Sequence, residues 1–443
     1  CARRKVFCIY ILDHDHEGHN QLGGARAWWL LQNLKSFDEQ LYQELGIKLN
    51  IYHGSSLEVL QRITNTYNIS AISWNRSYEP AHVKRDTSIK TFFQHQHIAA
   101  SSYEGNVLKE PFTIGTKTGA PYKVFTPFWK NLASCEINTP LNIPNTPVES
   151  FSAQDGLHAN DLELYNQNLS WGDKLAKYWH PGERAGLDRF QQFLEVAADY
   201  QDTRNRPDLS QTSKLSGYLS LGIISVRTIW HKAITHMSLE HPVANSFLSE
   251  LGWRDFAQHL MYHFPHITRE NFKPEFNNFP WQDNHELLEK WQRGQTGYPI
   301  VDAGMKELYE TGWMHNRVRM ITASFLTKHL RMHWKHGEKW FWECLVDADL
   351  ASNSASWQWV AGSGADAAPF FRIFNPITQG QKFDPNGSYT RQYLPELAQV
   401  HTNQLQTPWL LDKNAALYPK PIVDHAHARK EALEAYEIIR KRQ

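Results

Sequence analysis

The hydrophobic pattern of the sequence changes part-way along the chain, and this change constrains the fold more than any other feature. Up to residue 131, short apolar runs typical of buried strands alternate with segments of helical spacing. The expected strands are residues 6–12, 47–52 and 71–74, and the expected helices are residues 25–34 and 56–66. Such alternation predicts a parallel sheet with helices on its faces. We therefore expect a Rossmann-like α/β domain over residues 1–131, although no G-x-G-x-x-G follows a strand, which disfavours an ordinary dinucleotide enzyme.

A segment rich in Pro, Asn, Thr and Ser follows this first domain. Its composition predicts an interdomain linker over residues 132–170. Beyond it the strand signals vanish, and helical spacing covers residues 184–198, 226–236, 244–263, 286–293, 301–311, 318–334 and 427–443. We therefore expect residues 171–443 to form an all-helical domain.

Composition excludes several classes of protein. In a chain of 443 residues that is 41% hydrophobic, no apolar run is long enough to span a bilayer, and the first residues do not resemble a secretory signal. The four cysteines are Cys1, Cys8, Cys135 and Cys344, and they form neither a disulfide framework nor a metal-binding cluster. This pattern predicts a protein of the reduced cytoplasm. The net charge is zero, and this total is compatible with a local cluster of positive charge on one face.

One stretch of the helical domain is locally basic. Between residues 316 and 339 six cations stand against the single acid Glu338: Arg317, Arg319, Lys328, Arg331, Lys335 and Lys339. A solvated helix face explains such a run as well as a phosphate-binding face does. Trp313 and Trp334 favour the second explanation, because aromatic rings beside cations suit nucleic acid.

Three polar clusters are candidates for ligand binding. The hydroxyl-rich run at residues 212–216 precedes a helical segment and suits a phosphate, although such runs also cap helices. Asp347 and Asp349 have no histidines at metal-ligand spacing, so pairing with Arg319 or hydrogen bonds to a ligand are favoured over a metal. His14, His16 and His19 lie in or beside an acidic loop, where solvation is favoured over a metal site. We therefore expect no bound metal.

Several long motifs in one order carry a resemblance to a known family. They are Leu-Gly-Trp-Arg-Asp-Phe at residues 251–256, Thr-Gly-Tyr-Pro-Ile-Val-Asp-Ala at 296–303, Trp-Met-His-Asn-Arg-Val-Arg-Met at 313–320, Asp-Ala-Asp-Leu-Ala-Ser-Asn at 347–353, Trp-Gln-Trp at 357–359, and residues 366–376. Nearly the whole chain resembles the photolyase/cryptochrome family, and within it the class I-like bacterial enzymes that act on cyclobutane pyrimidine dimers. The resemblance implies an N-terminal antenna domain and a helical domain that holds a U-shaped FAD.

The resemblance also implies which residues bind the cofactor. Asp347 would pair with Arg319 beside the flavin, and Asn353 would face the reactive ring nitrogen of the flavin. Such side chains position a bound flavin and adjust its chemistry. The full implied set is Tyr200, Thr212, Ser213, Lys214, Leu215, Ser216, Arg254, Arg319, Asp347, Ala348, Asp349 and Asn353.

Damaged DNA is the implied substrate. Trp253 and Trp359 resemble the walls that hold a flipped-out dimer, and Glu250 resembles the acid that hydrogen-bonds it. Asn316 and Met320 would contact the dimer as well. The implied DNA-binding set is Arg204, Glu250, Trp253, Asn316, Arg317 and Gln379. The implied reaction is light-driven opening of the cyclobutane ring without net redox change, which makes the protein a lyase.

Three tryptophans resemble the electron relay of the family. Trp357, Trp334 and Trp281 match its proximal, middle and surface members. Taken singly, each tryptophan suits core packing better than function.

Several alternatives remain open. A blue-light cryptochrome shares the fold, but such proteins tend to lose the dimer-pocket residues and gain long tails. A six-four photoproduct enzyme is expected to carry a histidine where this chain has Asn316. The antenna is expected to be methenyltetrahydrofolate or a deazaflavin, with folate slightly ahead, although Ala81 and His82 lack the Asn-Glu pair of one folate site. The family also begins with one further strand, which is expected to be missing from this sequence, and we expect a monomer.

Overall fold

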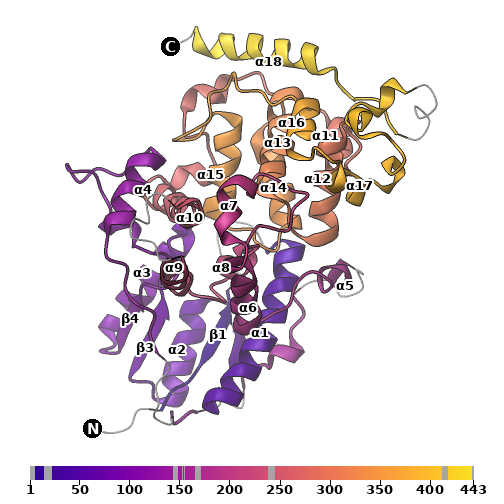
Figure 1. Cartoon of the computed structure of the whole chain (residues 1–443). Coiled ribbons are helices and arrows are strands. Elements are labelled where there is room, and N and C mark those ends of the chain that lie inside the picture. Colours follow the sequence, from indigo (N-terminus) through magenta and orange to yellow (C-terminus); the bar gives the residue numbers. More distant parts are fainter. Residues whose placement is uncertain are drawn as a thin grey trace.

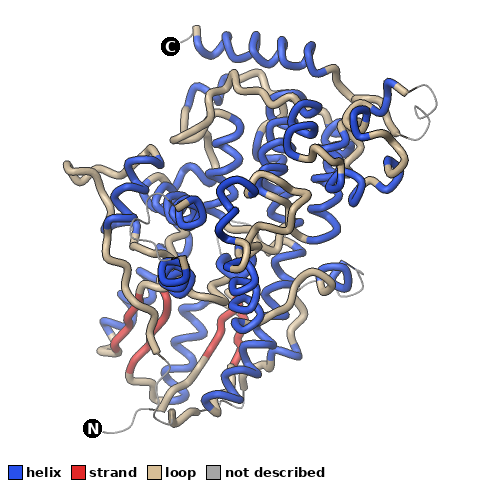
Figure 2. The backbone as a smooth tube through the Cα atoms, viewed as in Figure 1, coloured by secondary structure: helices blue, strands red, loops and turns tan. Residues whose placement is uncertain are grey.

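The strands and the helices separate into two parts of the molecule. The computed structural model describes residues 5–13, 22–142, 148–151, 153, 155–164, 171–237, 245–411 and 418–441. Figure 1 shows the strands at the end of the molecule that holds the N-terminus, and a larger helical body beyond them. Figure 2 shows the same division, with strands confined to the lower part of the view. The expected α/β domain followed by a helical domain is confirmed.

The N-terminal part contains parallel strands, as the alternation predicts. Its elements are β1 (Ile9–Leu12), α1 (Gly24–Leu45), β2 (Asn50–His53), α2 (Ser56–Tyr67), β3 (Ala71–Asn75), α3 (Pro80–His95), β4 (Ala99–Tyr103) and α4 (Phe125–Ser134). The strands form two separate two-stranded sheets, β1 with β2 and β3 with β4. Ile9 lies opposite Asn50 in the first sheet, and Ala71 lies opposite Ala99 in the second.

Helix α3 and strand β4 were not predicted, because neither has the regular apolar pattern that marks a helix or a strand. Helix α3 buries only Asp86, Ile89 and Phe93, so its sequence lacks an apolar stripe. Strand β4 consists of small and polar residues apart from Tyr103, so it lacks the β-branched residues typical of strands.

Six of the seven helical segments predicted for the second domain coincide with helices of the structure, which also contains further helices. Its helices are α5 (Trp171–Leu175), α6 (Glu183–Leu194), α7 (Tyr200–Thr203), α8 (Ser216–Ser220), α9 (Val226–His236), α10 (Ser246–His263), α11 (His285–Gln292), α12 (Pro299–Thr311), α13 (Asn316–Ser324), α14 (Trp334–Cys344), α15 (Leu350–Ala361), α16 (Pro376–Phe383), α17 (Ser388–Tyr393) and α18 (His425–Arg440). Helix α10 packs on both α4 and α15. The predicted boundary at residue 131 falls inside α4, whose side chains join the core around α10.

The single helix predicted over residues 318–334 is wrong. Helix α13 ends at Ser324, and a π-helical turn covers Phe325–His329. Arg331 then adopts a left-handed φ of 49°, which an α-helix does not tolerate. The side chain of His333 accepts a hydrogen bond from Lys335 N and caps the new helix α14.

The basic stretch is not a continuous phosphate-binding face. Lys328 is 1% exposed, and Trp334 is fully buried. The Lys328 ammonium donates to the carbonyl of Arg372 at 3.0 Å, and Trp334 donates to Asn271 at 2.8 Å. These side chains hold the core together, and only part of the stretch, including Arg317, reaches the surface of the cavity described below.

No described helix is long and apolar enough to cross a membrane. Within the same ranges, no group of three or more His, Cys, Asp or Glu side chains is arranged to hold a metal ion. The acidic loop with His14, His16 and His19 lies outside the described residues.

Candidate functional site

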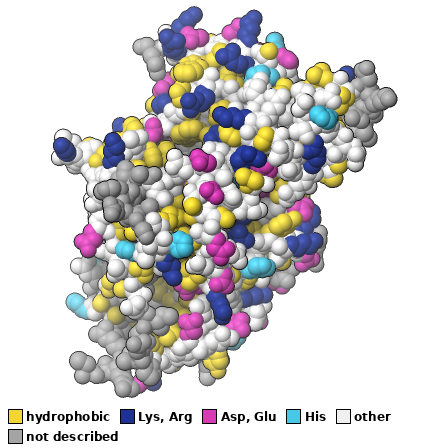
Figure 3. Space-filling view, viewed as in Figure 1, with side chains coloured by type: hydrophobic (Ala, Val, Ile, Leu, Met, Phe, Trp, Pro, Cys, Tyr) yellow, Lys and Arg dark blue, Asp and Glu magenta, His cyan; other side chains and the backbone are white. Residues whose placement is uncertain are grey.

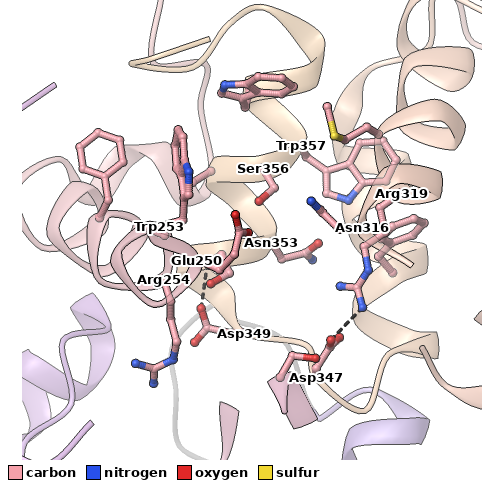
Figure 4. A pocket seen from close by; sticks show the side chains of 18 of the residues that line it. Glu250, Trp253, Arg254, Asn316, Arg319, Asp347, Asp349, Asn353, Ser356 and Trp357 are labelled. Atoms are coloured by element: carbon pink, nitrogen blue, oxygen red, sulfur yellow. Dashed lines mark hydrogen bonds and ion pairs between the residues drawn. The ribbon is translucent and has the colours of Figure 1, made fainter. Parts of the chain in front are cut away.

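A large cavity lies in the helical part of the molecule. It has a volume of about 570 Å³ and lies between α10, α13 and α15, with the segments around residues 212–216 and 345–349 closing its other sides. Figure 4 shows Glu250, Asn316 and Asn353 directed toward its middle from three different helices. The residues that the sequence motifs singled out therefore meet in one place.

An ion pair closes one end of the cavity. Arg319 Nη2 donates to Asp347 Oδ2 at 2.7 Å, and Arg319 Nε donates to the Met314 carbonyl, also at 2.7 Å. The Asp347 side chain is only 2% exposed, and its second oxygen Oδ1 has no hydrogen-bond partner among the described residues. A buried carboxylate oxygen without a partner is costly. Asp347 is therefore ready to accept a hydrogen bond from an N–H or O–H of a ligand.

Asp349 and Asn353 are fixed by the start of α15. Asp349 Oδ1 accepts from Ser352 N at 2.8 Å and so caps the helix, while its Oδ2 accepts from Gln258 at 3.1 Å. Asn353 lies one turn later and donates to the Glu338 carbonyl at 3.0 Å. These bonds set the orientation of both side chains at the cavity wall.

The hydroxyl-rich segment forms another wall. Thr212, Ser213 and Ser216 line the cavity, and the backbone of Lys214 is left-handed with a φ of 50°. The Lys214 ammonium lies 5.0 Å from the centre of the Trp313 ring, and burial lowers its pKa. Helix α8 has only five residues, so its dipole adds little to phosphate binding. Hydroxyls and one cation are therefore what this segment offers an anionic ligand, and Tyr200, beside Arg204, lines the same cavity.

Another part of the cavity wall combines aromatic rings with a carboxyl group. Trp253 and Trp359 are half-buried and line the cavity, together with Asn316 and Met320. Burial raises the pKa of the Glu250 carboxyl, and the nearby Arg204 guanidinium partly opposes this shift. Arg204 forms a short ion pair with Glu250. Two rings and a carboxyl group suit a flat ligand that carries hydrogen-bonding groups.

Three of the predicted residues lie outside the cavity. Trp357 lines it from α15, whereas Trp334, Trp281 and Gln379 do not. Trp334 lies on α14, three residues before Gly337, where a Cβ atom would come within 2.0 Å of the Trp357 ring. The ring of His333 lies 5.4 Å from Trp334 and 5.1 Å from half-buried Trp281. The rings of Trp334, His333 and Trp281 are thus near neighbours between buried Trp334 and half-buried Trp281.

Arg254 also makes hydrogen bonds to the N-terminal part of the chain. It lines the cavity, but its guanidinium donates to the carbonyl and side-chain oxygens of Asn106 at 2.5 and 2.6 Å. In Figure 4 it extends away from Asn353 and Asn316. These hydrogen bonds tie α10 to the N-terminal part of the chain, and a contact of Arg254 with the cofactor stays a prediction.

Sequence reasoning missed several lining residues. Ser352 and Ser356 line the cavity with Asp349, Asn353 and Trp357. This set follows the spacing of one helix face, so periodicity applied to residues 349–357 would have found it. Asp366 and Asn205 stand on loops and gave no such signal.

Comparisons with known proteins agree with this geometry. The family model described as the FAD binding domain of DNA photolyase matches residues 247–438, and the model described as DNA photolyase matches residues 1–147. A deoxyribodipyrimidine photo-lyase of Agrobacterium fabrum is 40% identical, over 98% of this chain and 93% of the relative. The chain belongs to the DNA photolyase family.

Solved structures place it in the same family. A bacterial class III photolyase from Agrobacterium tumefaciens superposes with a TM-score of 0.93 at 38% identity, over 99% of this chain and 92% of that one. An archaeal photolyase from Sulfolobus tokodaii with two FAD molecules superposes with a TM-score of 0.82 at 28% identity, over 98% of this chain and 94% of that one. The family expectation from the sequence is confirmed.

The cavity fits the FAD that this family binds. Asp347 Oδ1 lacks the hydrogen bond that a flavin ring N–H would supply, and the hydroxyls of residues 212–216 suit phosphate or ribose oxygens. The walls are also largely apolar, as expected for a site that holds a flat aromatic ring.

Proposed function

We propose that this protein is a light-driven repair enzyme that splits cyclobutane pyrimidine dimers in DNA. One observation carries the proposal. Two aromatic side chains, Trp253 and Trp359, and the carboxyl group of Glu250 line the same cavity as the polar set of Asp347, Asp349 and Asn353. A dimer and a cofactor bound there would therefore be close neighbours.

The cofactor part of the site is proposed to hold FAD through the residues implied by the motifs. When bound and reduced, FAD would supply the photoexcited electron that opens the cyclobutane ring and would recover it afterwards. Asp347 would accept a hydrogen bond from the flavin ring, and Arg319 orients that side chain by donating a hydrogen bond to its Oδ2. Asn353 would present its amide to the ring nitrogen, while Thr212, Ser213 and Ser216 would hold the phosphate chain.

The substrate part of the site is proposed to hold a dimer that has left the base stack. Trp253 and Trp359 would stack on its rings, because every base has a π-face that aromatic side chains bind. Glu250 in its protonated form would donate a hydrogen bond to a dimer carbonyl, with Asn316 and Met320 as further contacts. Burial favours that protonated form, since it raises the pKa of Glu250.

The DNA backbone is proposed to cross the mouth of the cavity beside Arg204, Arg317 and Gln379. Burial lowers the pKa of Arg317, and the neighbouring charges of Arg204 and Arg372 add to this effect. Guanidinium groups gathered in this way attract phosphates. Figure 3 shows Lys and Arg side chains scattered over the pictured face of the molecule.

Trp357, Trp334 and Trp281 are proposed to carry electrons between the protein surface and the cavity. Their order in space supports this role, because Trp357 lines the cavity, Trp334 is buried and Trp281 is half-buried. We further propose a monomer acting in the cytoplasm, with methenyltetrahydrofolate or a deazaflavin as a second chromophore. The three described cysteines are free, which suits a reducing compartment.

The proposed function is tested by flavin extraction and a repair assay. Heat-denatured protein is expected to release FAD in a ratio of about one per chain, because the cavity described above is proposed to hold one FAD. An oligonucleotide with one cyclobutane thymine dimer is expected to be repaired in blue light and not in the dark. A folded protein that releases no flavin, or equal repair in light and dark, would contradict the proposal.

Trp253→Ala is expected to weaken binding of dimer-containing DNA by about 1–3 kcal/mol, the value of one lost base–aromatic stack. Binding of undamaged DNA, held mainly through phosphates, is expected to stay unchanged. Fluorescence titration with both duplexes measures the two affinities. Tyr42→Ala, which removes an exposed ring on α1, is the control and should change neither. An equal loss for both duplexes would show that Trp253 does not contact the lesion.

Glu250→Gln is expected to remove a pH dependence of repair. In the wild type the raised pKa keeps the carboxyl protonated at higher pH, so the yield per absorbed photon should fall as the pH rises through that pKa. A glutamine donates its hydrogen bond at every pH, so its yield should be flat. Glu250→Ala should be lower throughout, by up to about 3 kcal/mol in apparent barrier. If the repair yield depends on pH in the same way in the wild type and in Glu250→Gln, the group that loses its proton is not Glu250.

A further inference from the structure

The Trp253 ring has one face toward the cavity and the other against Phe125. The two ring centroids are 3.6 Å apart and the planes differ by 9°, so the rings lie face to face. Most aromatic pairs in proteins are offset or perpendicular, with centroids about 4.5–7 Å apart. Phe125 therefore covers the back of Trp253 more completely than ordinary core packing requires.

Phe125 is itself held on several sides. It is 9% exposed and begins α4, and its backbone N donates to Asp366 Oδ2 at 2.8 Å. Asp366 lines the cavity from a loop that follows α15. Trp129, one turn along α4, is nearly parallel to Phe125 at 6.3 Å, and Phe256 meets Phe125 edge-on at 5.8 Å. The plane of the Phe125 ring is thus fixed by neighbours from α4 and α10.

The close approach of α4 to α10 depends on Gly252, the residue before Trp253. A Cβ atom at this position would lie 2.4 Å from the Trp129 ring, a separation that real Cβ atoms do not show. Any larger residue would push α4 away from α10. The absence of a side chain at Gly252 therefore allows the rings of Trp129, Phe125 and Trp253 to pack closely together.

We infer that Phe125 is a positioning residue for lesion recognition, which acts by holding the Trp253 ring in the plane that stacks on an unstacked pyrimidine pair. The inference rests on the proposed function, because it takes Trp253 as a wall of the dimer site. A ring fixed before binding loses little freedom when the substrate arrives, and such preorganisation increases affinity. Helix α4 begins 121 residues before α10, and through Phe125 it thereby becomes part of the substrate site.

Two aliphatic variants, Phe125→Leu and Phe125→Met, test this inference, and Phe125→Tyr is the matched control that keeps a ring. Both aliphatic variants are expected to bind dimer-containing DNA roughly 2- to 12-fold more weakly, as the loss of one aromatic pair predicts. Undamaged DNA affinity and flavin content should stay unchanged, and Phe125→Tyr should restore lesion binding. Because two aliphatic side chains of different shape are used, poor folding of one does not decide the outcome.

A spectroscopic measurement reports on the ring itself. In protein labelled with 5-fluorotryptophan, the fluorine signal that Trp253→Phe removes identifies Trp253. We expect that signal to shift and broaden in the aliphatic variants and to remain near its wild-type position in Phe125→Tyr. If the substitution instead loosened the packing of the protein in general, the fluorine signals of many tryptophans would shift together.

Two results would overturn the inference, and they are distinguishable. If the aliphatic variants bind the lesion like wild type while Trp253→Ala weakens binding, the stack has no part in recognition and the proposed function stands. If Trp253→Ala also binds the lesion like wild type, the dimer site is misplaced and the inference falls with it.

Discussion

Arg319→Leu is expected to destabilise the folded protein by about 3–5 kcal/mol and to abolish flavin retention. The substitution removes the only cation that the structure pairs with the Asp347 carboxylate among the described residues, and that side chain is 2% exposed. A buried carboxylate that loses its partner keeps its full desolvation penalty. The thermal unfolding midpoint of the apoprotein and the flavin absorbance of the purified protein measure the two effects.

Lys306→Leu provides the control for this prediction. Lys306 pairs with Glu396 at 3.1 Å, but both side chains are about a third exposed. Exposed pairs contribute about 0–1 kcal/mol, so this variant should unfold close to the wild-type midpoint and keep its flavin. If Arg319→Leu behaves like Lys306→Leu, the ion pair does not organise the cavity.

Trp357→Phe is expected to abolish photoreduction of oxidised flavin and to leave repair intact once the flavin is reduced chemically. Trp357 is the relay member that lines the cavity, and phenylalanine keeps most of its bulk but is much harder to oxidise. The loss of the oxidised-flavin absorbance band under blue light measures photoreduction, and a dithionite-reduced sample measures repair.

Trp291→Phe is the matched control. Trp291 is fully buried and meets Trp357 edge-on with centroids 6.1 Å apart, but it does not line the cavity. It should lose some stability through packing and photoreduce like wild type. Equal loss of photoreduction and repair in Trp357→Phe would assign that residue a different role.

The spacing of apolar residues along the sequence predicted those elements of the fold in which that spacing is regular. The strands over residues 6–12, 47–52 and 71–74 and about half of the described helices were found, because regularly spaced apolar residues mark them. Helix α3 was missed because few of its residues are buried, and the break after Ser324 was missed because a left-handed Arg331 leaves no compositional mark. Two separate parallel pairs instead of one sheet depend on long-range pairing, which periodicity does not encode.

The site was predicted through long motifs rather than through periodicity. Asp347, Asn353 and Trp253 meet at one cavity although the sequence separates them widely, and only the resemblance of ordered motifs placed them together. What the sequence did not reveal are the contacts between distant segments. The hydrogen bond from Phe125 to Asp366 joins residues 241 positions apart, and Arg254 is held by Asn106 across 148 positions. Such contacts form when helices and loops that are distant in the sequence pack together, so no local pattern of residues marks them.

The most direct test of the account is a competition between two lesions in one tube. The purified protein, with its flavin reduced, is mixed with two distinguishable oligonucleotides, one carrying a cyclobutane thymine dimer and the other a six-four photoproduct, and half of the mixture is kept dark. Only the cyclobutane dimer is expected to be repaired, and only in the illuminated half, because Asn316 stands where a six-four enzyme is expected to carry a histidine. Repair of the six-four product alone, or no light-dependent repair of either lesion, would contradict it.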